Sequence, residues 1–316
     1  MHHSFDKRLI RFENIDEIRT RPAFRDEIAA ASALPKEAVG VYRFPKDAPE
    51  QCGLSNCRTP HMKGFVVAMQ SGEETLIGCY CGAKKMGLAF QEVINRAQLA
   101  DRMQRYRDTI LAAIVNADEF DARLADLLDR PFGAKWVAKR VANCNATLPS
   151  EANYLIRRMA QRQEPDVFDA VPMTKKEIAI ARETGAIPKG QPGPYFRQEK
   201  VGVIVGLEIW RTDLRALLID DLQQGMRALK ALDVVSIRSE NALRNHARWV
   251  GEIPQKFSDA ERLIVAGQEF FDAGNLHLLK RLSTVEREIK GLAEAVDTLI
   301  SQTKANLQSP VTGNHQ

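Results

Sequence analysis

The sequence lacks several features that would place it in a large protein class. It has no uninterrupted apolar run of about eighteen residues, so we expect no transmembrane helix. Residues 1–8 lack the apolar core of a secretory signal peptide, so we expect a cytoplasmic protein whose thiols stay reduced. Aromatic residues are only 7% of the chain, and this composition favours a helical protein. The net charge of +4 neither demands nor excludes a nucleic-acid partner.

Motifs of the common enzyme classes are also missing. The chain contains no glycine-rich loop of the P-loop or dinucleotide-binding type, and no Gly-x-Ser-x-Gly nucleophile turn. A nucleobase deaminase needs His-x-Glu, but Met62 and Lys63 follow His61. Metal-dependent nucleases of the HNH type need a second histidine or an asparagine on the helix of their metal site. Lys84 and Lys85 stand early in the only comparable helix expected here, which follows Cys81. We therefore expect a protein without enzymatic activity.

Cysteine is scarce, with five residues, yet four of them lie between positions 52 and 81. The spacing is Cys52-x4-Cys57-x3-His61, followed by Cys79-x-Cys81. Residues 64–78 between the two halves predict two short strands around a Ser71-Gly72 turn, and a helix is expected from Gly82. Thiolates suit Zn²⁺, and a helix N-terminus favours the thiolate form. We expect one Zn²⁺ held by Cys52, Cys57, Cys79 and Cys81, with His61 as the alternative fourth ligand.

The segment of about residues 50–107 resembles a treble-clef zinc finger. The resemblance is carried by Cys52, Cys57, the Gly72 turn and Ile77-Gly-Cys-Tyr-Cys-Gly82. The resemblance implies a structural zinc. The chain has four residues between the first two cysteines and one between the second two, which leaves the fourth ligand open. The alternatives are buried free cysteines, which pack as small apolar groups, and a disulfide, which needs an oxidising compartment.

Hydrophobic periodicity predicts a mostly α fold with a small zinc-stabilised β-hairpin module, hence α+β, and a C-terminal helical hairpin or coiled coil. A strand at 39–44 is expected to pair with the hairpin. Gly185 to Pro194, rich in glycine and proline, is expected to divide the chain. The expected parts are an N-terminal zinc-finger module with its helix (1–110), a basic helical middle domain (111–190), a linker or short strand (191–207), long helices (208–305) and a flexible tail (306–316).

The C-terminal part carries a heptad seam from Leu278 to Thr303, with Leu282, Val285, Ile289, Leu292, Val296 and Leu299 between them. Gly251 to Pro254 is expected to separate this helix from one at 208–251, so that the two form an antiparallel hairpin. The seam of the first helix is thin near Gly225 and Ser236. We therefore expect self-association through the C-terminal helices.

Residues 130–163 form the most basic window, with seven basic residues against Glu151 alone. Two short helices there, joined by 143–149, predict a helix-turn-helix-like pair that contacts phosphates. Lys84 and Lys85 follow the zinc ligand Cys81, where such a helix can face a polyanion. The expected nucleic-acid contacts are Lys84, Lys85, Lys135, Lys139, Arg140, Arg157, Arg158 and Arg162. A solvated basic face is the alternative.

Three functions remain open. The first is a non-enzymatic zinc-finger protein associated with nucleic acid, DNA in particular, that assembles through its C-terminal helices. The second is a structural or adaptor protein whose zinc only holds the fold and whose partners are proteins. The third is a metal-dependent nuclease, which the missing catalytic residues argue against.

Overall fold

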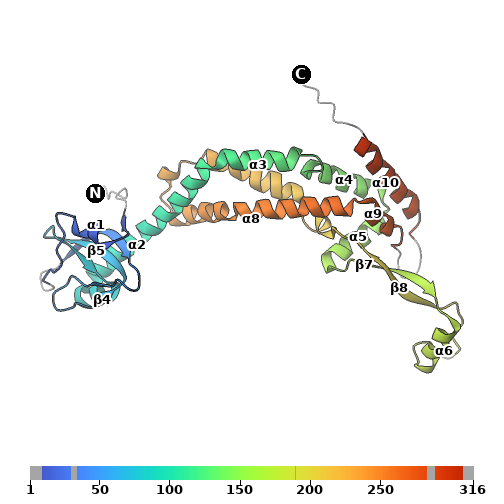
Figure 1. Ribbon diagram of the computed structural model, residues 1–316, viewed down its shortest axis with the longest axis horizontal. Helices are drawn as coiled ribbons and strands as arrows, with labels where there is room; N and C mark the ends of the chain where they lie inside the picture. Colours follow the sequence, from blue (N-terminus) through green and yellow to red (C-terminus); the bar gives the residue numbers. More distant parts are fainter. Residues whose placement is uncertain (1–8, 30–33, 189, 283–288, 309–316) are drawn as a thin grey trace, which may run out of the picture. The chain divides into compact units, whose positions relative to one another are not determined.

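The computed structural model describes residues 9–29, 34–188, 190–282 and 289–308 of the chain, with side chains up to 302 (Figure 1). The chain forms two compact units. The first contains Met1–Val115 and Leu232–Gly251, and the second contains Asn116–Ala231 and Glu252–Gln316. The described residues are mostly helical with a few small sheets, as an α+β chain should be. Of the helices that the structure describes, none is both long and apolar enough to cross a membrane.

A four-stranded sheet in the order β1-β2-β5-β6 is the base of the first unit. The strands are β1 (Ile10–Phe12), β2 (Pro35–Arg43), β5 (Lys63–Met69) and β6 (Glu74–Ile77), with β1 parallel to β2 and the other pairs antiparallel. β5 and β6 form the expected hairpin, and Gly72 in its turn has φ +90°, a conformation that glycine adopts without strain. The pairing of β2 with β5 confirms the strand predicted at 39–44.

The two faces of this sheet are both buried. Alternate residues of β5 point to opposite sides, so Phe65, Val67 and Met69 join one apolar cluster and Val66 joins another. The first cluster includes Phe90 and Ile94 of helix α2 (Cys79–Val115), which packs on β2 and β5. The second is covered by α1 (Ile15–Arg19) and the segment after it, through Ile18 and Phe24. The sheet is therefore a two-sided core, to which the cysteine-bearing segments attach.

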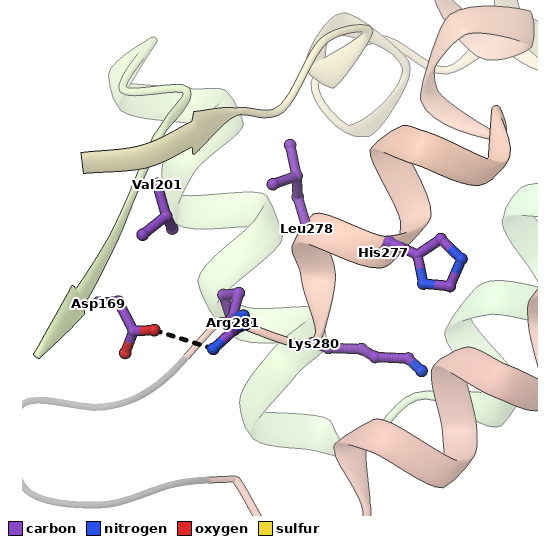
Figure 2. A pocket seen from close by; sticks show the side chains of 6 residues that line it. All are labelled: Asp169, Val201, His277, Leu278, Lys280 and Arg281. Carbon is purple, nitrogen blue, oxygen red and sulfur yellow. Dashed lines mark hydrogen bonds and ion pairs between the residues drawn. The ribbon is translucent and has the colours of Figure 1, made fainter. Parts of the chain in front are cut away.

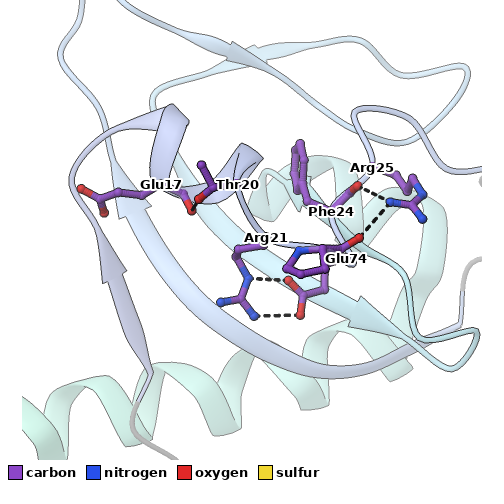
Figure 3. A network of polar contacts seen from close by, with 7 residues as sticks. Glu17, Thr20, Arg21, Phe24, Arg25 and Glu74 are labelled. Atoms are coloured by element: carbon purple, nitrogen blue, oxygen red, sulfur yellow. Dashed lines mark hydrogen bonds and ion pairs between the residues drawn. The ribbon is translucent and has the colours of Figure 1, made fainter.

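The segment after α1 is fastened to β6 by a partly buried ion pair (Figure 3). Arg21 Nε donates to Glu74 Oε2 at 2.6 Å, and its Nη2 donates to Oε1 at 2.9 Å. The backbone of Glu74 also bonds to both sides of Phe24: its N–H donates to Ala23 O at 2.8 Å, and its carbonyl accepts from Arg25 N at 2.7 Å. Side-chain and backbone contacts together hold this segment as an extra edge of the sheet.

The second unit is helical around an aromatic core. Its helices are α3 (Ala117–Asp129), α4 (Ala134–Thr147), α5 (Ser150–Arg162), α7 (Gln224–Lys230), the later part of α8 (Glu240–Phe270), α9 (Ala273–Leu279) and α10 (Leu292–Gln308). Phe257 and Phe270 of α8 are fully buried, and the ring centroid of Phe270 lies 5.4 Å from that of Trp210 in a 3₁₀ turn, η1 (Leu207–Trp210). α8 is thus the central helix of this unit.

A two-stranded ribbon interrupts the helices, and it corrects the expected linker. β7 (Asp166–Pro172) pairs antiparallel with β8 (Phe196–Val203), and α6 (Lys175–Glu183) lies at the far end of the ribbon (Figure 1). The Gly/Pro-rich segment 185–194 therefore connects α6 to β8 inside the second unit and does not divide the chain. The glycine and proline content of 185–194 correctly indicated a connecting segment. The pairing of β7 with β8, which the composition does not reveal, determines which elements that segment joins.

The expected helix break at Gly251–Pro254 is wrong, because α8 runs through it without interruption. An internal proline costs a helix about 3 kcal/mol or more. The apolar stripe, however, continues on both sides of Pro254 through Val250, Ile253 and Phe257, all of them buried. Burial of that stripe outweighs the lost backbone hydrogen bond.

The continuous helix expected at 208–251 and the second one, expected to carry the heptad seam, are also wrong. Aspartates cap new elements inside 208–305: Asp213 accepts from the backbone N–H of Arg215 and of Ala216, Asp233 from Val235, and Asp272 from Gly274. Between Asp213 and Asp233 the chain forms a π-helix, η2 (Ala216–Gln223), and then α7. After Asp272 it forms α9, and then α10 after Gly291.

The heptad residues therefore do not share one helix. Leu282, Ile289, Leu292, Val296 and Leu299 are buried, and α10 packs on α9 and α4 of the same chain. Val285 and the side chain of Thr303 lie outside the described residues. The described seam is thus covered within the chain, and self-association through the C-terminal helices stays a prediction.

Gly206 shows how closely the second unit is packed. Its φ is +74°, and a Cβ added there would lie 2.0 Å from Ala266 O and 2.9 Å from Phe270 N. We expect Gly206→Ala to destabilise the second unit by about 1–3 kcal/mol, because backbone atoms of α8 would have to shift. Urea unfolding checks this. Gly251→Ala is the control: a Cβ there meets open space inside a helix, so equal or higher stability is expected. An equal loss in both variants would contradict the steric argument.

Candidate metal centre

The first two cysteines lie on a tight turn next to a short strand pair. β3 (Glu50–Gln51) pairs with β4 (Pro60–His61), and the pairing continues to Cys52, whose N–H donates to Thr59 O at 3.1 Å. Cys57 N then donates back to Leu54 O at 3.1 Å. Asn56 and Arg58 both have positive φ, at 69° and 45°, which closes the turn. This local geometry brings the Cys52 and Cys57 side chains to the same side.

The third cysteine comes from the start of α2. The chain leaves β6 at Ile77 and enters α2 at Cys79, with Gly82 N bonded to Gly78 O at 3.0 Å. Cys81 is buried within the first turn, while Cys79 is exposed. A side chain added at Gly82 would collide with the ring of Phe90. Phe90 lies beyond Gly87, whose backbone is not helical (φ 61°, ψ −137°), so glycine is needed where the start of α2 packs against the part of α2 after this kink.

The structure brings Cys52, Cys57 and Cys81 together. Their Sγ atoms all lie within 4.8 Å of one another, and none of the three forms a disulfide. In a tetrahedral zinc site with Zn–S bonds of about 2.3 Å, sulfurs lie roughly 3.8 Å apart. The trio is therefore close to metal-binding geometry, and it could hold a metal ion.

The three thiols differ in how easily they lose a proton. Burial raises the pKa of Cys52 to about 12 and also raises the pKa of Cys81. Burial acts in the same direction on Cys57, but the hydroxyl and backbone N–H of Thr59 outweigh it and lower the pKa of Cys57 to about 7. Without a cation, the cluster thus favours one thiolate among three. A bound cation would offset the repulsion among three thiolates.

Cys79, the fourth ligand we expected, is not part of this group. Residues two apart on an α-helix point about 200° away from each other, since each residue turns the helix by roughly 100°. Cys81 faces the cluster, so Cys79 faces outward and is exposed.

His61, the alternative ligand, lies on β4 next to the cluster. Its Nδ1 is 2.8 Å from the hydroxyl of Tyr42, and its Nε2 is buried without a hydrogen-bond partner among the residues that the structure describes. Burial lowers the pKa of His61, which favours the neutral ring. The fifth cysteine, Cys144, is buried alone in α4, as expected of a packed thiol.

Two of the eight residues expected to contact nucleic acid are either buried or held in an ion pair. Arg140 is only 5% exposed, donates to Gln302 O at 3.2 Å, and lies with its guanidinium 5.3 Å from the centroid of the Trp136 ring. It occupies the inner face of α4 with Val137 and Cys144, so it supports the fold and is not open to phosphates. Lys135 forms an ion pair with Asp129.

The other six are exposed, and none forms an ion pair with another described residue. They are Lys84 and Lys85 on α2, Lys139 on α4, and Arg157, Arg158 and Arg162 on α5. α4 extends to Thr147, so Leu148 and Pro149 alone connect it to α5, a shorter turn than expected. Arg157 donates to Asn145 Oδ1 at 3.0 Å across this turn, and its guanidinium lies 5.7 Å from the centroid of the Trp210 ring.

A pocket in the second unit lies between the ribbon and α9 (Figure 2). Asp169 and Val201 of the ribbon line one side, and Arg281 donates to Asp169 at 3.0 Å across it. His277 and Lys280 point away from this pair, and Lys280 bonds to Asp297. The polar groups do not converge on one point, so the pocket does not gather a set of possible ligands as the cysteine trio does.

Comparison with known protein families, curated proteins and solved structures found no match to this chain.

Proposed function

We propose that this chain is a zinc-stabilised, non-enzymatic protein that associates with nucleic acid, DNA in particular. The observation that carries the proposal is the coexistence of the three-cysteine cluster with six exposed basic side chains that lack an acidic partner among the described residues. Soft thiolate ligands select Zn²⁺ over Mg²⁺ or Ca²⁺. Sites rich in thiolates are typical of structural zinc, which stabilises a fold without reacting.

The exposed face of α5 is the better-supported contact surface. Tyr154, Arg158 and Arg162 are spaced four residues apart and therefore lie on one side of the helix. Tyr154 is 64% exposed, and the Arg158 guanidinium lies 5.9 Å from the centroid of its ring. An exposed aromatic ring next to unpaired arginines suits both base stacking and phosphate contacts.

The first turns of α2 offer a second, smaller surface. Tyr80 is 75% exposed, and Lys84 follows it four residues later on the same side of the helix. Lys85 is exposed beside it. This surface begins at the cysteine cluster, so the metal would order the turn that presents these residues.

Replacement of Arg158 and Arg162 by alanine is expected to weaken binding to a labelled 20-mer duplex about 10-fold or more. The logarithm of the binding constant falls linearly with the logarithm of the salt concentration, and each lost phosphate contact makes that slope less steep by about 1. We therefore expect the slope to become less steep by roughly 2. Fluorescence anisotropy at several salt concentrations measures both quantities. The same titration with a single-stranded 20-mer shows which form is preferred.

The matched control is Arg130→Ala with Lys135→Ala. These residues belong to the same basic window and carry the same charge, but Arg130 pairs with Asp126 and Lys135 with Asp129. We expect the control to change affinity less than twofold. Equal losses in the two double variants would indicate a net-charge effect and argue against a defined surface on α5.

The adaptor function is the second candidate, because one face of the β7–β8 ribbon is exposed and partly apolar. Phe168 and Phe196 on this face are 46% and 53% exposed. Isolated two-stranded ribbons are marginally stable in water, so a protein partner would stabilise this one. Loss of partner binding in a Phe168→Ser/Phe196→Ser variant that keeps full DNA affinity would support this function.

A further inference from the structure

We propose that His61, oriented by Tyr42, is the fourth metal ligand and completes a Cys₃His site with Cys52, Cys57 and Cys81. This inference rests on the metal site proposed above. A structural zinc site is almost always four-coordinate, so three thiolates leave one position to fill. Cys79 is exposed, whereas His61 Nε2 is buried without a hydrogen-bond partner among the described residues, and this difference favours His61.

Strand register places His61 on the same face as Cys52. Glu50 opposes His61 in the β3–β4 pair, and Cys52 opposes Thr59, whose carbonyl accepts the Cys52 N–H. Side chains two residues apart on a strand share a face, so Cys52 and His61 are diagonal neighbours across the pair. Thr59 lies between them, and its hydroxyl is 3.4 Å from Cys57 Sγ.

The His61 ring also lies against the start of α2, which supplies Cys81. A Cβ added at Gly78 would be 2.7 Å from Cδ2 and 3.3 Å from Nε2 of His61. The Nε2 edge therefore faces the turn between β6 and α2. His61 thus lies between the two segments that carry the thiols, although it is outside the group of atoms within 4.8 Å of one another. Binding of a metal ion would require the ring and the three thiols to move closer together.

The hydrogen bonds of the ring agree with a ligand role. If Nδ1–H donates to the Tyr42 oxygen, Nε2 carries a lone pair that is buried and has no partner among the described residues. A metal ion supplies that partner. Metal-binding histidines commonly donate their other ring N–H to an oxygen that fixes the ring. Tyr42 can hold that position because it is 3% exposed and stacked on Phe44 at 4.7 Å.

Cobalt spectroscopy of the full-length chain tests the ligand set, since the charge-transfer and d–d bands of bound Co²⁺ report the number of thiolates and the geometry. We expect Cys79→Ser to keep the wild-type spectrum and to bind Zn²⁺ within about twofold of wild type. His61→Ala should shift the d–d bands and weaken Zn²⁺ binding by about 100-fold or more. Tyr42→Phe, which keeps the ring but removes the hydroxyl, should weaken it about 10-fold with an unchanged thiolate signal. Cys57→Ser is the reference for loss of one thiolate.

The outcomes separate the two proposals. A spectrum that changes in Cys79→Ser, together with unaltered bands in His61→Ala, would overturn the role of His61 and leave the metal site intact. If His61→Ala does not fold, Tyr42→Phe and Cys79→Ser provide the test. The proposal is overturned if Tyr42→Phe binds Zn²⁺ with wild-type affinity and Cys79→Ser loses a thiolate signal. Wild-type protein that binds neither Co²⁺ nor Zn²⁺ would overturn the metal site itself.

Discussion

Removal of the metal is expected to unfold the cysteine-bearing segments of the first unit. Structural zinc contributes an apparent binding free energy of about 10–16 kcal/mol in small zinc-finger peptides at neutral pH. That range equals or exceeds the total stability of an ordinary domain, which is about 5–15 kcal/mol. Burial opposes the ionisation of Cys52 and Cys81, so three thiolates without a cation would be strongly unfavourable there. Cys81→Ser should have the same effect as a chelator.

The expected damage is local, because the sheet has its own two-sided core. Hydrogen exchange measured by mass spectrometry should show faster exchange over 50–62 and 78–90 after chelation, with smaller changes in β2 and β5. Cys144→Ser is the control: it removes a buried thiol from α4 of the second unit and should leave the metal bound. Unchanged exchange over 50–90 after complete removal of metal would show that the segments fold without it.

Loss of the Arg21–Glu74 ion pair is expected to destabilise the first unit by about 3–5 kcal/mol. Arg21→Ala would leave the Glu74 carboxylate, in a residue that is only 8% exposed, without its charged partner (Figure 3). The substitution also removes a guanidinium that lies 5.8 Å from the centroid of the Phe12 ring. Exchange rates of backbone amides in 63–77 report the free energy of opening of this unit directly.

Arg19→Ala is the matched control for this prediction. Arg19 is two residues away and pairs with Asp26 at 3.4 Å and Glu50 at 3.3 Å, but its side chain is 48% exposed. Surface pairs of this kind contribute at most about 1 kcal/mol. The double variant Arg21→Met/Glu74→Leu should recover much of the lost stability, because it leaves no buried charge. Similar losses for Arg19→Ala and Arg21→Ala would contradict the role of burial.

Local signals in the sequence predicted the elements that depend on neighbouring residues. Gly72 marks the β5–β6 turn, and its positive φ is the physical reason. Thr174 and Glu177, which have the residue types and spacing of a capping box, form one at the start of α6, with the Glu177 N–H donating to Thr174 Oγ1 at 3.3 Å. The two basic helices, α4 and α5, were likewise expected from the sequence. Each of these depends on contacts within a few residues along the chain.

Elements that depend on distant contacts were not predictable in this way. Pro254 signals a helix end, but burial of Ile253 and Phe257 in the second unit keeps α8 intact. The leucines from 278 onward follow a heptad pattern, yet the chain forms α9 and α10 in place of one long helix. The caps at Asp213, Asp233 and Asp272 were visible in the sequence and would have indicated these breaks.

The same division holds for the site. The sequence by itself located the segments that carry the cysteine cluster, because four of the five cysteines lie between positions 52 and 81. It could not decide between Cys79 and His61, because that choice depends on which way a helix and a strand face each other. Charge counting likewise identified the basic window, but only the tertiary structure separated Arg140, buried on the inner face of α4, from Arg158, exposed on α5. Residue type sets the chemistry that a side chain offers, whereas packing decides whether that chemistry is used inside the fold or remains open to a partner.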